Sequence, residues 1–142
     1  MRRLPLLLGS RVLTAVGLAL VAGGFVGWAA RAREGIVFDA ESKTFGALPV
    51  ETKQIVPFRM TNRSARPVRI VGAEETCTPE GCIYAPKLPL EVAARETREL
   101  PIQIKTRSPG AFFRELRLFT DCPERPIVVL RVKGHVSDEK AP

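Results

Sequence analysis

Hydrophobic residues are distributed in two different ways along this chain of 142 residues. Near the amino terminus they form one continuous apolar run, Val12–Ala30, in which Thr14 is the one clearly polar side chain. From residue 34 onward apolar and polar residues alternate, without a sustained helical period. Alternation with a period of two predicts half-buried β-strands, whereas a long continuous run predicts a helix surrounded by lipid.

The apolar run Val12–Ala30 would measure about 28 Å as a helix, which is close to the hydrocarbon thickness of a bilayer. Arginines flank it, and those before it, with the amino terminus, slightly outweigh those after it, which favours a cytoplasmic amino terminus. The alternative is a cleaved signal peptide, because Ala30-Arg31-Ala32 fits a small-x-small cleavage site. Residues 1–33 are therefore predicted to be a membrane anchor or a signal segment. The rest of the chain is expected on the extracytoplasmic (periplasmic or cell-surface) side, or secreted after signal cleavage.

The alternating part predicts one β-domain over residues 34–136, followed by a polar, flexible tail over residues 137–142. Turn signals recur about every eight to twelve residues, which is typical of a β-sandwich of about seven short strands. The first predicted strand is short and interrupted, and consists of Ile36–Phe38 and Thr44–Leu48. The inward positions predicted for the later strands are Val56, Phe58 and Met60, Val68 and Ile70, Leu100, Ile102 and Ile104, Phe112, Leu116 and Leu118, and Val128, Leu130, Val132 and Val136.

Proline, glycine and arginine residues mark irregular points in this pattern. Pro57 and Pro101 have no N–H to donate to a ladder, so each predicts a sheet edge or a bulge. Ser108–Gly110 fits a type II turn, with a positive φ at Gly110. Arg114 interrupts an inward-facing row of apolar residues, which predicts a bulge or a strand end there.

Four segments resemble the bacterial domain of unknown function 1573, an Ig-like module related to the major sperm protein, ASH and PapD group. They are Phe45-Gly46, then Phe58–Asn62 followed by Pro67–Ile70, then Cys77, and finally Gly110–Phe112 with the closing Leu130–Val136. The resemblance implies an Ig-like sandwich without enzymatic activity. Two departures from that family are the six-residue stretch Cys77–Cys82 in place of Cys-Gly-Cys, and Glu91–Glu96 in place of a Pro-Gly-Glu turn.

Cys77 and Cys82 bracket a Thr-Pro-Glu-Gly segment that suits a type I turn. Such a turn brings the flanking residues within reach of a disulfide, which is the expected outcome in an oxidising compartment. The alternative is a thiol-based redox or metal site that also uses Glu74, Glu75 and Glu80. That alternative lacks the Cys-x-x-Cys spacing, a second cysteine pair and a nearby histidine.

Cys122 is the remaining cysteine, and its expected state depends on the strand count. If Ile83–Ala85 forms a strand, the loop 121–126 lies at the opposite end of the sandwich from residues 77–82. Cys122 is then a free thiol or pairs with another chain. Without that strand the two loops share an end, and Cys122 would compete for a partner. We favour opposite ends.

The net charge of +7 belongs mainly to the amino-terminal segment. Residues 1–33 hold five arginines and no acid, which leaves 17 Lys/Arg against 15 Asp/Glu, a charge of +2, on the domain. A phosphate-binding surface needs a clustered excess of cations, so we expect no nucleic-acid partner. A lone histidine, His135, makes no triad or metal cluster, and no glycine loop opens a helix. We therefore expect no enzymatic activity, no cofactor and no small-molecule substrate.

Four apolar residues fall on the outward parity of the last two strands: Phe113, Phe119, Ile127 and Val129. If these strands pair, the four side chains form an exterior patch for docking a partner, unless the N-terminal strand or the register covers them. Strand addition along an open edge is a second way of binding. The expected function is a membrane-anchored extracytoplasmic Ig-like module that binds an unknown envelope protein.

Overall fold

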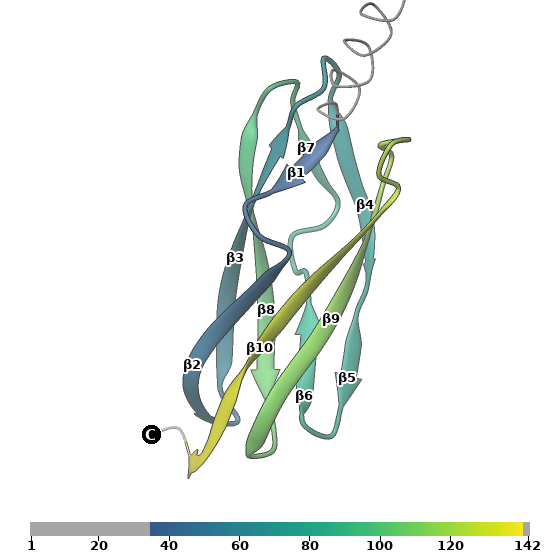
Figure 1. The fold of residues 1–142 in the computed structure, drawn as a ribbon. Helices are drawn as coiled ribbons and strands as arrows, with labels where there is room; N and C mark the ends of the chain where they lie inside the picture. The colour runs from purple at the N-terminus through teal and green to yellow at the C-terminus, as the bar shows by residue number, and fades with distance from the viewer. Residues whose placement is uncertain (1–34, 141–142) are drawn as a thin grey trace, which may run out of the picture. The chain divides into compact units, whose positions relative to one another are not determined.

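Residues 35–140, which the computed structural model describes, form ten β-strands in two five-stranded sheets (Figure 1). The predicted membrane segment Val12–Ala30 lies outside these residues. Within residues 35–140, no helix has the length and apolar character to cross a membrane. The strands are β1 (Ile36–Phe38), β2 (Ser42–Val50), β3 (Lys53–Asn62), β4 (Val68–Glu74), β5 (Thr76–Thr78), β6 (Gly81–Tyr84), β7 (Leu90–Val92), β8 (Thr97–Thr106), β9 (Gly110–Thr120) and β10 (Ile127–Lys140).

Sheet A has the strand order β1-β3-β8-β6-β5, and sheet B has the order β2-β10-β9-β4-β7. Strand β2 pairs with β10 in parallel, and the other pairs are antiparallel. Consecutive strands lie in different sheets except for β5–β6 and β9–β10, so the chain crosses between the sheets at each of the other connections. The all-β sandwich predicted from the alternation is therefore confirmed.

The predicted number of seven strands is wrong. The interrupted first strand consists of two strands, β1 and β2, which belong to different sheets. The short strands β5 and β7 add to the count, because three residues suffice to extend a sheet edge. Strand β10 also continues to Lys140 beside β2, where the sequence predicted a polar tail from Ser137.

The core between the sheets consists of the inward-facing residues of both. Every predicted inward residue of β3, β8 and β10 is buried, with Phe58, Ile102 and Leu130 fully inaccessible. Phe45 packs edge-on against Phe112, with 5.4 Å between ring centroids. Gly134 makes room for this, because a Cβ there would come within 2.4 Å of the Phe45 ring.

Pro57 and Pro101 face each other in the β3–β8 ladder without a register shift. The neighbouring strands have already ended at this level: β1 pairs with Met60–Asn62 of β3, and β6 pairs with Gln103–Thr106 of β8. Each proline thus stands at a local sheet edge, as predicted. The predicted positive φ at Gly110 is also confirmed, at 115°.

The predicted bulge or strand end at Arg114 is wrong. Strand β9 pairs continuously with β10 through this point, with Arg114 opposite Val132. The guanidinium reaches the hairpin between β5 and β6, where Glu80 accepts a hydrogen bond at 2.7 Å and the hydroxyl of Thr78 is a further partner. An inward arginine is tolerated because this hairpin supplies its counter-charge.

Asn62, at the end of β3, joins the two sheets through a buried set of hydrogen bonds. Its amide nitrogen donates to the carbonyls of Arg66, Val92 and Ala93 at 2.7, 3.0 and 3.1 Å. Its amide oxygen accepts from the N–H and the hydroxyl of Ser64. One side chain thereby fixes the β3–β4 turn and the end of β7.

Candidate functional site

The outer face of sheet B carries a row of exposed apolar side chains close to the β9–β10 hairpin. Ile127 of β10 lies directly opposite Phe119 of β9. On the other side of β9 the ladder shifts between Ile70 and Gly72 of β4, so that Val71 and Gly72 together oppose Phe119. Val71, Phe119 and Ile127 are 52%, 37% and 53% exposed. We call these three residues the apolar row.

Three of the four predicted docking residues meet at this place. Val129, which is half-buried, follows Ile127 on the same side of β10. Phe113 is separate, because it lies opposite Lys133, six residues along β9 from Phe119. At the rise of a strand these two phenylalanines are about 20 Å apart. All four predicted residues thus lie on the outer face of sheet B, with Phe113, which is 51% exposed, apart from the other three.

Charged pairs fill the outer face of sheet B between the apolar row and Phe113. Arg117 bonds Glu74 at 3.3 Å, and Arg131 bonds Glu115 at 2.7 Å. These pairs are exposed, and such pairs contribute little to stability. They delimit the apolar row on the side away from the hairpin.

Sequence reasoning missed Val71. Its signal was the alternation itself, because Arg69 faces out and Val71 follows two residues later. The pairing of β4 with β9 brings Val71 beside Phe119, although 48 residues separate them in sequence. That pairing is a tertiary property, which a strand's own pattern does not contain.

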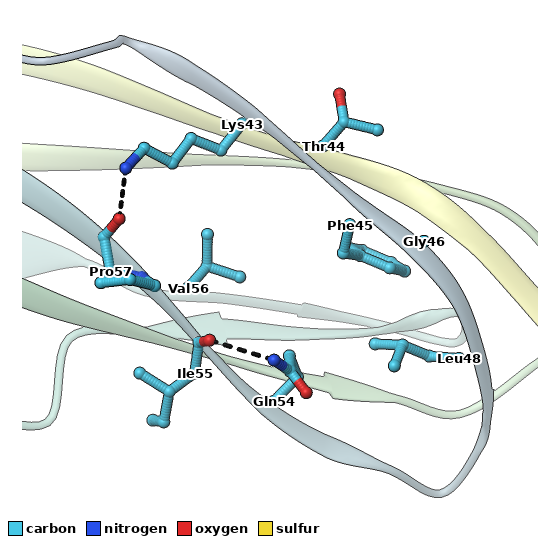
Figure 2. A pocket seen from close by; sticks show the side chains of 9 residues that line it. All are labelled: Lys43, Thr44, Phe45, Gly46, Leu48, Gln54, Ile55, Val56 and Pro57. Atoms are coloured by element: carbon cyan, nitrogen blue, oxygen red, sulfur yellow. Dashed lines mark hydrogen bonds between the residues drawn. The ribbon is translucent and has the colours of Figure 1, made fainter.

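A groove of about 370 Å³ opens between β2 and the amino-terminal half of β3. Figure 2 shows Lys43 reaching across it from β2 to the carbonyl of Pro57, and Gln54 bonding the carbonyl of Ile55. Ile55 is 45% exposed beside this groove. The groove is a second candidate for a binding site, on an open strand edge.

The open edge of β3 is already occupied by hydrogen bonds from its own chain. Arg59 donates its N–H to the carboxylate of Asp39 and accepts the N–H of Asp39, at 3.0 and 2.9 Å. Pro57 has no N–H, and its carbonyl accepts a hydrogen bond from Lys43. The carbonyl of Ile55 accepts one from the side chain of Gln54. Because strand addition needs free backbone groups, this edge is a poor template for a partner strand.

Asp39 holds this capped edge together through its charge. Burial raises its pKa, but hydrogen bonds from Lys43 and from the N–H groups of Arg59 and Ala40 outweigh that effect and hold the pKa below its ordinary value of 3.8. Lys43 forms an ion pair with Asp39 at 2.8 Å and also lies over the ring of Phe58. The carboxylate is thus ionised when the edge is closed.

Cys77 and Cys82 are joined in a disulfide across the β5–β6 hairpin. They lie directly opposite each other in the ladder, and Pro79 and Glu80 form the turn between them. Cys82 is buried and Cys77 is exposed. Gly81 adopts a φ of 153°, and a Cβ there would come within 2.2 Å of the carbonyl oxygen of Lys105. The predicted pairing is therefore present, on the outer face of sheet A.

The loop between β9 and β10, which contains Cys122, lies at the opposite end of the sandwich from the β5–β6 hairpin, as predicted for a chain in which β6 is present (Figure 1). Cys122 forms no disulfide within residues 35–140 and is buried. Its Sγ donates to the carboxylate of Glu124 at 3.2 Å. Burial raises the pKa of this thiol, and the bond to Glu124 adds to the rise, so the thiol stays protonated at neutral pH.

A cluster of three or more histidine, cysteine or acidic side chains able to hold a metal ion does not occur in the described part of the chain. Glu74, Glu75 and Glu80, which the sequence placed near the cysteines, have separate partners: Glu74 pairs with Arg117, Glu75 accepts the N–H of Ala85, and Glu80 pairs with Arg114.

The two sheets form an Ig-like β-sandwich whose fold resembles that of PapD-like domains. The chain is similar to the ASH / PapD-like domain of human CEP192 (PapD-like domain 7), with a TM-score of 0.56 and 9% identity, over 76% of this chain and 89% of that one. No family model and no curated protein sequence matches it.

Two longer proteins contain a similar fold. The YadV chaperone matches with a TM-score of 0.50 and 10% identity, over 75% of this chain and 54% of that one. The VesB protease of Vibrio cholerae matches with a TM-score of 0.57 and 13% identity, over 78% of this chain and 35% of that one. The chain therefore spans about half of the first protein and a third of the second. At these identities the likeness establishes the fold alone.

Proposed function

We propose that this protein is a single-pass membrane protein whose Ig-like domain lies outside the cytoplasm and binds an envelope protein without catalysing a reaction. Val12–Ala30 would be the anchor, and the apolar row with Val129 would be the binding surface. We also propose that the chain belongs to the bacterial domain of unknown function 1573, on the segments quoted above. A secreted form after signal cleavage is the alternative for its location.

The observation that carries the proposal is the alignment of Val71, Phe119 and Ile127 across three neighbouring strands. Fully burying a side chain of this size is favourable by about 1.5–3 kcal/mol, so a row of them left in water favours contact with another surface. The rigid ladders of sheet B hold the row in place, which lowers the entropy lost on binding.

Two further observations support the proposed location. The length and apolar character of Val12–Ala30 suit a bilayer, with arginines on both flanks. The disulfide between Cys77 and Cys82 suits an oxidising compartment outside the cytoplasm.

The test compares two double variants of the full chain in its native membranes. Phe119→Ser with Ile127→Ser removes two members of the apolar row. Phe113→Ser with Ile55→Ser changes the same residue types at sites of similar exposure outside the row. After detergent extraction, partner proteins that co-purify with the tagged chain are quantified by mass spectrometry.

We expect the first variant to lose a specific partner about tenfold or more and the second to retain it, since a few central apolar residues dominate most interfaces. Both variants should unfold at the wild-type denaturant concentration, because exposed substitutions rarely change stability. Equal partner recovery in the two variants would reject the apolar row as the binding surface.

A further inference from the structure

Three arginines extend from the end of the sandwich at which the described chain begins. Arg63 and Arg66 lie in the β3–β4 turn, and Arg95 lies in the β7–β8 turn. All three are exposed, and none forms an ion pair with another residue of the 35–140 region. Figure 1 shows both turns at the end where β1 starts, away from the β5–β6 hairpin.

The carboxylates at this end are used within the domain. Glu96 bonds Arg98 at 2.7 Å and accepts the N–H of Ala93. In the β9–β10 hairpin, Asp121 accepts the N–H of Arg69, and Glu124 accepts the thiol of Cys122. The carboxylate of Glu124 also interacts electrostatically with Arg66, although the two form no ion pair. Residues 63–66, 93–98 and 121–125 together hold five arginines, Arg63, Arg66, Arg95, Arg98 and Arg125, against three acids, Glu96, Asp121 and Glu124, which leaves a local charge of +2.

The covalent chain keeps this end within reach of the segment that we propose as the anchor. Four residues, 31–34, separate Ala30 from Gly35, so five Cα–Cα steps of an extended chain span about 17 Å at most. The carbonyl of Gly35 in turn accepts the N–H of Arg63 at 2.8 Å. If Val12–Ala30 lies in the bilayer, this tether leaves the β3–β4 turn within reach of the lipid headgroups.

We propose that Arg63, Arg66 and Arg95 bind the phosphates of anionic phospholipids and so dock this end of the domain on the membrane surface. The inference depends on the proposed membrane anchoring. Arginine binds phosphate through several N–H groups, and each cation near an anionic surface adds about fivefold to binding at physiological salt. Docking would fix the end that carries the β3–β4 turn against the membrane surface and leave the outer face of sheet B accessible to a partner.

The experiment uses the full chain reconstituted in vesicles of phosphatidylcholine, with or without phosphatidylglycerol. A fluorescent amino acid replaces the exposed Ala65 in the β3–β4 turn, and energy transfer to a headgroup-labelled lipid reports its distance from the surface. The same probe at the exposed Pro109, at the opposite end, serves as the reference position. Carbonate extraction of the same vesicles establishes whether the chain is an integral membrane protein.

We expect transfer from position 65 to rise when phosphatidylglycerol is present and to fall again at high salt, while transfer from position 109 stays unchanged. Arg63→Glu with Arg66→Glu should lower the anionic-lipid response at least tenfold. Arg63→Lys with Arg66→Lys should retain most of it. Lys53→Glu with Arg107→Glu makes the same charge change at the opposite end and should have no effect.

Two results would overturn the inference, and they are distinguishable. A chain that resists carbonate extraction but gives the same transfer from position 65 with and without phosphatidylglycerol contradicts the lipid docking and leaves the anchoring intact. A chain that carbonate removes from the vesicles contradicts the anchoring, and the docking with it.

Discussion

The outer faces of both sheets are formed by every second residue of their strands, but the two faces expose different kinds of side chain. On sheet A, polar pairs and the disulfide close the face: Thr61 bonds Thr97 at 2.9 Å, and Cys77 is joined to Cys82. On sheet B, the apolar row stands open between the hairpin and the charged pairs.

The difference shows that a single exposed apolar side chain among polar neighbours does not make a binding surface, whereas several adjacent ones can. Ile55 on sheet A is opposite Gln103 and beside an edge capped by Lys43 and Gln54. Phe119 on sheet B has apolar neighbours on both adjacent strands. We infer that sheet A serves stability and that sheet B serves binding, and the following changes test this division.

The largest effect is expected from Asn62→Ala, which removes the link between the sheets without altering either outer face. Three carbonyls lose their amide donor, and two Ser64 donors lose their acceptor. Unsatisfied buried groups cost about 1–3 kcal/mol each, so we expect unfolding free energy to fall by about 3 kcal/mol or more. Chemical unfolding followed by circular dichroism measures this.

Ser64→Ala, which leaves the three amide donations of Asn62 in place, should lower the unfolding free energy far less. Equal losses in the two variants would show that the amide donations contribute little.

Removal of the sheet A disulfide should have the next largest effect. Cys77→Ser with Cys82→Ser removes a cross-link that restricts the unfolded chain, so the conformational entropy of the unfolded state rises. The unfolding free energy should fall by about 2 kcal/mol, the value expected for closing a loop of this size. Partner recovery should stay at the wild-type level under conditions where the domain is folded. Thiol titration during reduction is the second measurement. A pair that mild dithiols reduce readily, with a change in partner binding, would favour the redox hypothesis for these cysteines.

The smallest effect is expected at the capped edge of β3. Because the folded pKa of Asp39 lies below its ordinary value of 3.8, its stabilising effect is present above that pH and is lost as the pH falls through the folded value. Asp39→Asn should therefore lower the unfolding free energy slightly at neutral pH and converge with wild type in acid. Denaturant unfolding at several pH values measures the difference. A gap that widened in acid would contradict the assigned charge state.

The alternation of single strands was enough to predict the all-β fold and the buried residues. Phe58, Ile102 and Leu130 are inaccessible because each follows the parity of its own strand. The disulfide was predictable for a similar reason, since both cysteines lie in one hairpin.

The features that escaped sequence reasoning depend on contacts between distant segments. Arg114 looked like a strand end because its partner, Glu80, lies 34 residues away. The alternation of β9 correctly predicted that Phe113 and Phe119 lie on the same face of the sheet. It does not indicate which residues of the neighbouring strands lie beside each of them. Val71 joined the apolar row through a bulge in the β4–β9 ladder.

Site-specific photocrosslinking in intact cells tests the central claim, that the protein is contacted through the outer face of sheet B. A photoreactive amino acid is placed at Ile127 on sheet B or at Gln103 on sheet A. We expect one defined protein adduct from position 127, lost in the Phe119→Ser variant, and little adduct from position 103. Equal protein adducts from both positions, or lipid adducts alone from position 127, would contradict the claim.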